Sequence, residues 1–177
     1  MKAPQYLFTI CKNVLCLKLR GNITYLDSYP FDSFSRHIFT QPDFTSVLID
    51  LSETTGIDST NLGILARIGN AARTRSGEKA TIIATSPDIS RTLESMGFGQ
   101  VFTVINEPAP PGAALKPLPP AAPEGVTGLA ETILDAHREL MSISKQNEKT
   151  FRSVVDFMEK DIARLKGRKK PPARRRE

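Results

Sequence analysis

Hydrophobic and polar residues alternate over residues 5–10 and 14–21. A period of two is typical of strands with one buried face. The residues Lys12 and Asn13 between the two runs fit a two-residue turn, so we expect a β-hairpin. In this register six apolar side chains share one face of the hairpin: Tyr6, Phe8, Ile10, Leu15, Leu17 and Leu19.

Strand and helix patterns alternate after the hairpin. Continuous apolar runs at 46–51, 80–85 and 101–105 predict strands, of which the first two are buried on both faces. Helices are predicted for 27–39, from residue 59 or 60 to 75, and from 87 to 96, the last capped by Ser86 and ended by Gly97. This order predicts an α/β fold whose mixed sheet contains the N-terminal β-hairpin and parallel βαβ units, with helices packed on the sheet.

The composition changes at residues 106–125, which hold seven of the 13 prolines. A segment so rich in proline forms neither a helix interior nor a central strand, so we expect an extended, semi-rigid linker. The predicted organisation is a domain at 1–106, a proline-rich linker at 107–125, an amphipathic helical segment at 126–166 and a disordered basic tail at 167–177.

Apolar residues recur at three- and four-residue steps from residue 127 to 165. One long helix with a single apolar stripe must cover that stripe with a second copy, the N-terminal domain or a partner. Asn147 interrupts the stripe. It fits either register control in a coiled coil or a break between two helices of a hairpin, and the pattern leaves both open.

The net charge of +5 is unevenly distributed. Residues 164–177 hold eight Lys or Arg and one Glu, or +7, so the rest of the chain carries −2. A mildly acidic domain argues against nucleic-acid binding by the whole domain. The tail could touch nucleic acid or anionic lipid, or serve only as a solubilising end.

Two further patterns bear on the compartment. No apolar run is long enough to span a membrane, and the N-terminus lacks the apolar core of a signal peptide. Cys11 and Cys16 have neither metal-ligand spacing nor facing positions in the hairpin, so we expect two reduced cysteines. We therefore expect a cytoplasmic protein.

Motifs for catalysis are absent from the sequence. His37 and His137 are the only histidines, and neither lies at metal-ligand spacing from Cys, Asp or Glu, so each is expected to be an exposed or interface residue. Glycine-rich phosphate loops and paired carboxylates are missing too. We expect no catalytic residue, no metal site and no cofactor.

The junction at 57–65, IDSTNLGIL, is the strongest candidate for function. Asp58, Ser59 and Thr60 stand where a strand passes into a helix, and one of them can cap the helix. Alternatively, a phosphoserine here would lie at the positive end of the helix dipole, on an exposed rim where a partner could detect it.

Residues 5–106 resemble the STAS domain, in particular the anti-sigma factor antagonists. The segments that carry the resemblance are NVLCLKLRGNI, with a glycine turn after its strand, SPDISRTLESMGFGQVFTV and, above all, VLIDLSETTGIDSTNLGIL. The last is similar to the family's signature, a buried strand ending in Asp, a spacer, and then Asp-Ser-Ser/Thr-Gly-Leu-Gly.

The resemblance implies a bacterial protein with a STAS-type sheet and a phosphorylation switch. It implies that an anti-sigma factor with serine kinase activity phosphorylates Ser59, that a serine phosphatase reverses this, and that only the unphosphorylated form binds the anti-sigma factor and so regulates transcription. The implied partner-binding residues surround Ser59: Asp58, Thr60, Asn61, Leu62 and Thr24.

The sequence departs from the family pattern in two places. Asn61 stands where the family usually has glycine, and Asn22 and Thr24 follow Gly21 where the family commonly has an acid. The alternative to the switch is a non-catalytic STAS scaffold subunit of a transporter or signalling assembly, without a regulated serine. The C-terminal helical segment favours that alternative, and we expect it to mediate self-association or docking.

Overall fold

The computed structural model describes residues 3–41, 43–108, 114–123, 125 and 127–167. The predicted basic tail falls almost wholly at 168–177 and so lies outside the described residues. No helix among the residues that are described has the length and apolar character needed to cross a membrane.

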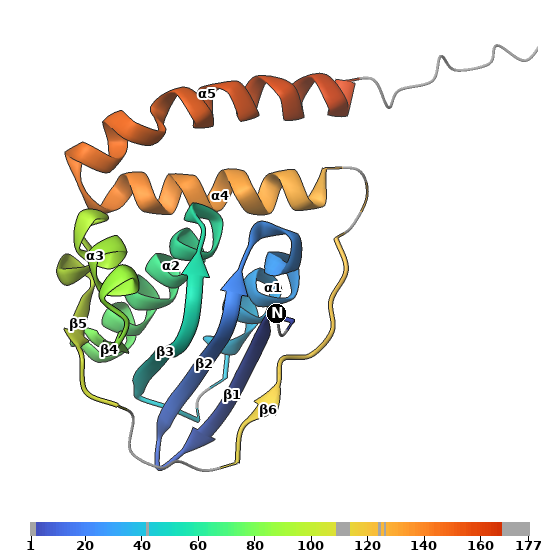
Figure 1. Ribbon diagram of the computed structural model, residues 1–177. Helices are drawn as coiled ribbons and strands as arrows, with labels where there is room; N and C mark the ends of the chain where they lie inside the picture. Colours follow the sequence, from blue (N-terminus) through green and yellow to red (C-terminus); the bar gives the residue numbers. More distant parts are fainter. Residues whose placement is uncertain (1–2, 42, 109–113, 124, 126, 168–177) are drawn as a thin grey trace, which may run out of the picture.

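A six-stranded mixed sheet forms the centre of the molecule, in the order β5-β4-β3-β2-β1-β6 (Figure 1). Neighbours from β2 to β5 run parallel, whereas β1 is antiparallel to both β2 and β6. The predicted fold class is thereby confirmed. The strands are β1 (Gln5–Cys11), β2 (Val14–Ile23), β3 (Ser46–Ile57), β4 (Ala80–Ile83), β5 (Phe102–Ile105) and β6 (Lys116–Pro117).

The predicted hairpin register is confirmed. Ile10 pairs with Leu15 and Phe8 with Leu17. The turn residues Lys12 and Asn13 have φ angles of 50° and 64°, the left-handed conformation that a tight hairpin turn of this type requires. Cys11 and Cys16 are free cysteines and both are half-buried.

Helices α1 and α2 lie behind the sheet in Figure 1 and bury its apolar face. The main core joins side chains such as Phe31, Leu65 and Ile68 of these helices to Leu17 and Ile49 of the strands. The helices and 3-10 turns are η1 (Tyr25–Asp27), α1 (Ser28–Ile38), α2 (Ser59–Ser76), α3 (Pro87–Ser95), η2 (Phe98–Gln100), α4 (Gly128–Ile143) and α5 (Lys145–Gly167).

The ends of β2 and β3, which lead toward α2, differ from the prediction in two details. The sequence pattern ended a strand at residue 51 and placed a connection after it, but β3 runs on to Ile57. Gly21 has a φ of 81° without ending its strand, because β2 continues to Ile23 beside β3. Register shifts on either side of Gly21 absorb the irregularity and carry both strands to the start of α2.

Part of the proline-rich segment joins the sheet as an edge strand. Leu7 pairs with Pro117 and Phe8 with Lys116, and Leu118 donates its amide to the carbonyl of Tyr6 at 3.1 Å. Proline is tolerated at an edge because its missing N–H faces away from the ladder. The chain thus returns along β1 and reaches α4 at the far end of the sheet (Figure 1).

The C-terminal segment is a helical hairpin, which resolves the alternatives that the sequence left open. The helices separate at Ser144, whose extended backbone has φ −155° and ψ 155°. Asn147 is buried and donates its amide to the carbonyls of Met96 and Leu140, both at 3.0 Å. It therefore joins the hairpin to the N-terminal domain and marks no coiled-coil register.

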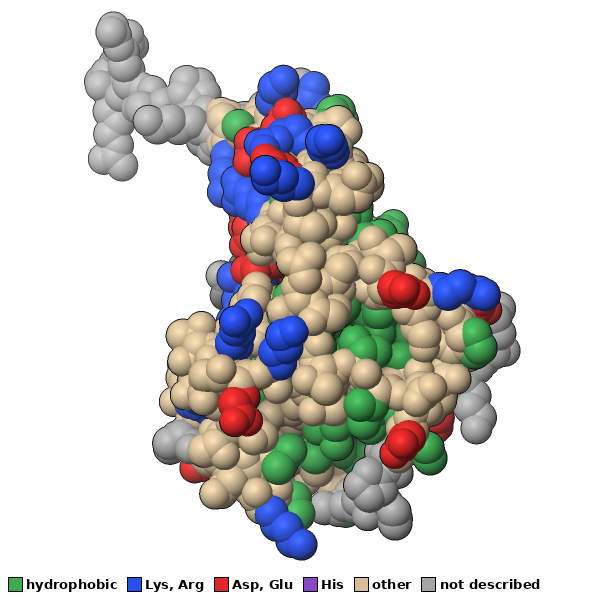
Figure 2. Space-filling view, turned by 90° about the vertical axis from the view of Figure 1, so that its left-hand side faces the viewer, with side chains coloured by type: hydrophobic (Ala, Val, Ile, Leu, Met, Phe, Trp, Pro, Cys, Tyr) green, Lys and Arg blue, Asp and Glu red, His purple; other side chains and the backbone are tan. Residues whose placement is uncertain are grey.

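Apolar residues are exposed on the side of the sheet that β5 borders. Val104 is 40% and Ile105 37% exposed. Figure 2 views the molecule from that side and shows hydrophobic side chains gathered there.

Candidate functional site

Asp58 caps α2 and joins three elements. Its Oδ1 accepts hydrogen bonds from the backbone amide and the side-chain amide of Asn61, both at 3.0 Å. Its Oδ2 accepts the backbone amide of Tyr25 at 2.5 Å. The end of β3, the first turn of α2 and the start of η1 are therefore held together by one carboxylate.

Ser59 is the first residue of α2, is half-buried, and contacts the C-terminal hairpin. Its Oγ lies 3.0 Å from Nε2 of His137 on α4. The Nδ1 of His137 lies 2.8 Å from the carbonyl oxygen of Ile133, which can only accept. In the neutral imidazole Nδ1 therefore carries the hydrogen, and Nε2 accepts the hydrogen bond from the Ser59 hydroxyl.

The residues expected beside Ser59 are brought together, but they are not exposed. Thr60, Asn61 and Leu62 are 3%, 0% and 2% exposed, and Thr24 is half-buried beside η1. These three side chains therefore lie beneath the rim that was expected at Ser59, and Asp58 and Ser59 themselves are half-buried. The physical reason is packing, since Leu62 belongs to the main core and Asn61 accepts the Tyr6 hydroxyl at 3.2 Å.

Tyr6 extends the site on the β1 side. Burial raises the pKa of its hydroxyl far above the usual value, and the nearby carboxylates of Asp27 and Asp58 raise it further. Tyr6 therefore stays protonated and remains a hydrogen-bond donor to Asn61.

Helix α4 packs directly on α2 one turn beyond Ser59. A Cβ placed on Gly63 would lie 2.0 Å from the carbonyl oxygen of Ala136, so the two helix backbones touch. Figure 1 shows α4 lying across the end of the sheet at which β2 and β3 terminate. Only glycine at position 63 permits this close approach.

A buried charge cluster fixes α4 further along. Asp32 of α1 is 4% exposed and forms ion pairs with Arg36 and Arg67. Thr132 of α4 donates its hydroxyl to the same carboxylate at 3.2 Å, and Asp135 pairs with Arg36 at 2.9 Å. Thr132 and Asp135 of α4 therefore contact charged groups of α1, one of which also pairs with Arg67 of α2.

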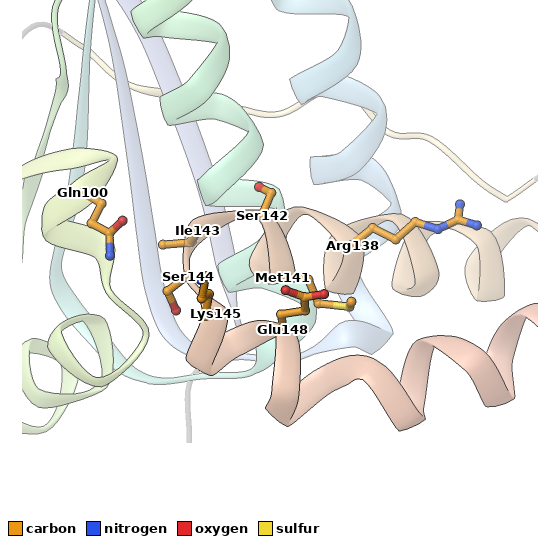
Figure 3. Close-up of a pocket in the computed structure, with 8 residues that line it drawn as sticks. All are labelled: Gln100, Arg138, Met141, Ser142, Ile143, Ser144, Lys145 and Glu148. Atoms are coloured by element: carbon orange, nitrogen blue, oxygen red, sulfur yellow. The ribbon is translucent and has the colours of Figure 1, made fainter.

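The arrangement at Ser59 places a hydroxyl beside a base at the positive end of an 18-residue helix. An anionic group at this position would be stabilised by the helix dipole. The hollow shown in Figure 3 lies elsewhere, at the α4–α5 turn, where Gln100 extends toward Ser144 and Arg138 points away. The described residues contain no cluster of three potential metal ligands.

The sequence interpretation missed two residues, distant in the sequence, that contact the site: His137 bonds to Ser59 and Tyr6 bonds to Asn61. His137 was expected only at an interface or exposed, and Tyr6 only in the hairpin core. The sequence separations are 78 residues for Ser59 and His137 and 55 for Tyr6 and Asn61. No local pattern predicts such pairs. The one usable signal was the apolar stripe of the C-terminal segment, which required a covering surface.

Comparisons with known proteins agree with the fold. No curated protein matches the chain. Among solved structures, the unphosphorylated form of the anti-sigma factor antagonist SpoIIAA has 14% identity and a TM-score of 0.50, covering 59% of this chain and 90% of that one. The phosphorylated form of SpoIIAA, the Bacillus cell fate determinant, has 14% identity and a TM-score of 0.47, covering 59% and 93%.

The Thermotoga maritima protein TM1081 is a further similar structure, with 17% identity and a TM-score of 0.48, covering 56% of this chain and 78% of that one. The STAS domain family model matches residues 8–109, which hold most of the sheet and the whole of the Asp58–Ser59 junction. The chain therefore belongs to the STAS domain family.

Proposed function

We propose that this protein is a phosphorylation-switched interaction module that antagonises an anti-sigma factor and so regulates transcription. The observation that carries the proposal is the division of labour at the start of α2. Asp58 supplies the helix cap, so modification of the adjacent Ser59 would not remove that cap. The name of the similar SpoIIAA structure, an anti-sigma factor antagonist, supports the same function.

The switch would act through charge. A phosphoserine carries nearly two negative charges at neutral pH, and the amino end of α2 tolerates them. A partner docked on the same face would meet this dianion beside Asp58, and like charges in an interface cost several kcal/mol. Unphosphorylated Ser59 therefore permits binding, and phosphorylated Ser59 prevents it.

The chain itself performs no reaction in this proposal. An anti-sigma factor with serine kinase activity transfers the phosphoryl group to the Ser59 Oγ, and a serine phosphatase removes it. In this proposal both partners and the protein itself are cytoplasmic. The half-buried Asp58 and Thr24 supply surface that they recognise, and the buried Thr60, Asn61 and Leu62 hold that surface in shape from beneath.

Affinity capture from native cells tests the proposal. Ser59→Ala should retain a protein kinase that mass spectrometry identifies, and Ser59→Glu should lose it. Ser153, exposed on α5, provides the matched controls Ser153→Ala and Ser153→Glu, which should both retain the kinase. Equal capture of the kinase by Ser59→Ala and Ser59→Glu would sink the proposal.

One observation favours a second candidate, a scaffold subunit without a regulated serine. Ser59 is already hydrogen-bonded to His137 and lies against α4, so it could serve only to fix the hairpin. A scaffold would form the same stable assembly with either Ser59 variant. Its partner would also be recovered from cells in which Ser59 carries no phosphate.

A further inference from the structure

Helix α4 occupies the same face of α2 that carries Ser59. The contacts follow α2 in steps of one turn. Ser59 bonds to His137, Gly63 touches the backbone of Ala136, and Arg67 shares the Asp32 carboxylate with Thr132. This run of contacts covers the first half of α2 on one side.

We propose that α4 is an intramolecular cover of Ser59, and that a kinase or binding partner reaches this residue only by displacing α4. The biological meaning of the cover rests on the proposed function. The cover itself rests on the contacts between α2 and α4.

A phosphoryl group does not fit the covered state. The space between the Ser59 Oγ and the His137 Nε2 is 3.0 Å and holds one hydrogen bond. A phosphate would place a phosphorus atom and three further oxygens there. The imidazole is held by the Ile133 carbonyl and lies edge-on against Phe151, with ring centroids 5.2 Å apart. With the Ser59 side chain in this orientation, a phosphoryl group therefore requires His137 and α4 to move away.

Release of α4 exposes apolar surface of the N-terminal domain, so another apolar surface must take the place of α4. Four hairpin residues belong to the main core of the N-terminal domain: Ala136, Leu140, Ile143 and Phe151. Water is a poor substitute for these contacts, but a second helix is a good one. The displacing partner should therefore present an amphipathic helix to the α1–α2 face.

The chemistry of α4 defines what that helix must carry. A small residue must face Gly63, because the backbones touch there. When α4 leaves, Asp135 leaves with it, and the carboxylate of Asp32 alone faces the two guanidinium groups of Arg36 and Arg67. The displacing helix must therefore carry a carboxylate next to its small residue, in the place of Asp135 opposite Arg36.

Cysteine alkylation tests the cover without any knowledge of the partner. Ser59→Cys places a thiol at the covered position, and iodoacetamide labelling followed by peptide mass spectrometry measures the rate of this introduced thiol separately from those of Cys11 and Cys16. Ala136→Arg forces a long charged side chain into the α2 contact and should raise the rate of the introduced thiol about tenfold, as expected for local opening. The matched control Ala163→Arg, at an exposed position of α5, should leave that rate unchanged.

The native cysteines report on global unfolding in the same experiment. If Ala136→Arg also raises the alkylation rates of Cys11 and Cys16, the variant unfolds globally and a milder one is needed. Asp135→Arg places a second arginine beside Arg36, and its alkylation rate at position 59 then tests the cover. An alkylation rate at position 59 that neither variant raises, with the native cysteines unchanged, overturns the cover. The cover is also overturned if the thiol of Ser59→Cys, with no arginine variant present, is alkylated as fast as the same thiol in an unfolded peptide.

The two proposals fail in different ways. A protected thiol at position 59, combined with a native protein that never carries phosphate at Ser59, supports the cover and contradicts the switch. Phosphate at Ser59 of the native protein, combined with a freely reactive thiol in Ser59→Cys, supports the switch and contradicts the cover.

Discussion

At the scale of single residues, the junction between β3 and α2 assigns helix capping and the contact with α4 to two different side chains. Either Asp58 or Ser59 could have capped the helix, and the structure assigns the cap to Asp58. The side chain of Ser59 instead crosses to His137. A hydroxyl that supports no local backbone structure can be modified without loss of the cap.

The Lys18–Asp50 pair shows how a largely buried ion pair is held between β2 and β3. Burial by itself would raise the pKa of Asp50, but hydrogen bonds from Lys18 and Ser52 outweigh burial and lower it. A lowered pKa in the folded state adds stability at neutral pH. This contribution is lost as the pH falls below the ordinary aspartate pKa of about 3.9.

We predict that Lys18→Met destabilises the protein by about 3 kcal/mol at pH 7, because it leaves the Asp50 carboxylate buried without its cation. The loss should shrink below about pH 4, where Asp50 becomes protonated in the unfolded chain and in the variant. Urea unfolding at pH 7 and at about pH 3.5 measures the difference. Lys149→Met, at an exposed lysine of α5, is the control, and an equal loss for Lys18→Met at both pH values would contradict the pairing.

At the scale of elements, the sequence pattern predicted those features that neighbouring residues determine, such as a hairpin register and the end of a helix. Alternation set the β1–β2 register, and Gly77 in the left-handed conformation ended α2 where the pattern stopped. The extension of β3 to Ile57 could not be read in this way. The residues SETTG have no strong strand pattern, and their pairing with Gly21 and Asn22 of β2 holds them in the sheet.

The break at Ser144 and the edge strand β6 were also beyond sequence patterns. Asn147 looked like a polar interruption of one stripe, and its acceptor at Met96 lies 51 residues away. Lys116 and Pro117 become a strand only because β1 offers an open edge. The candidate site shows the same limit, since Asp58, Ser59 and Thr60 were identified by spacing, whereas His137 required the tertiary fold.

We predict that Asn147→Ala destabilises the protein by about 1–3 kcal/mol, because it leaves two buried carbonyls without their donor. The loss should be accompanied by faster amide exchange in α4 and α5 than in the sheet. Chemical denaturation and hydrogen exchange measure the two effects. Asn106→Ala, at an exposed asparagine, should change neither, and an unaffected hairpin in Asn147→Ala would show that this side chain does not hold it.

At the scale of the whole molecule, the protein combines a STAS domain with a helical hairpin that packs on the side of the domain carrying Ser59. The domain presents Ser59 at the end of the sheet, and α4 crosses that end while α5 packs on α4 through Leu134, Val155 and Ile162 (Figure 1). In the proposed account, the additional segment controls access to the serine, and phosphorylation of Ser59 is coupled to a rearrangement of α4 and α5.

The most direct test of the central claim is the phosphorylation state of Ser59 in protein isolated from native cells. Intact mass spectrometry before and after phosphatase treatment, with fragmentation to locate the site, measures it. We predict a species heavier by one phosphoryl group, located at Ser59 and abolished by Ser59→Ala. Phosphate located only at other residues, or a single unmodified species under all growth conditions, would contradict the account.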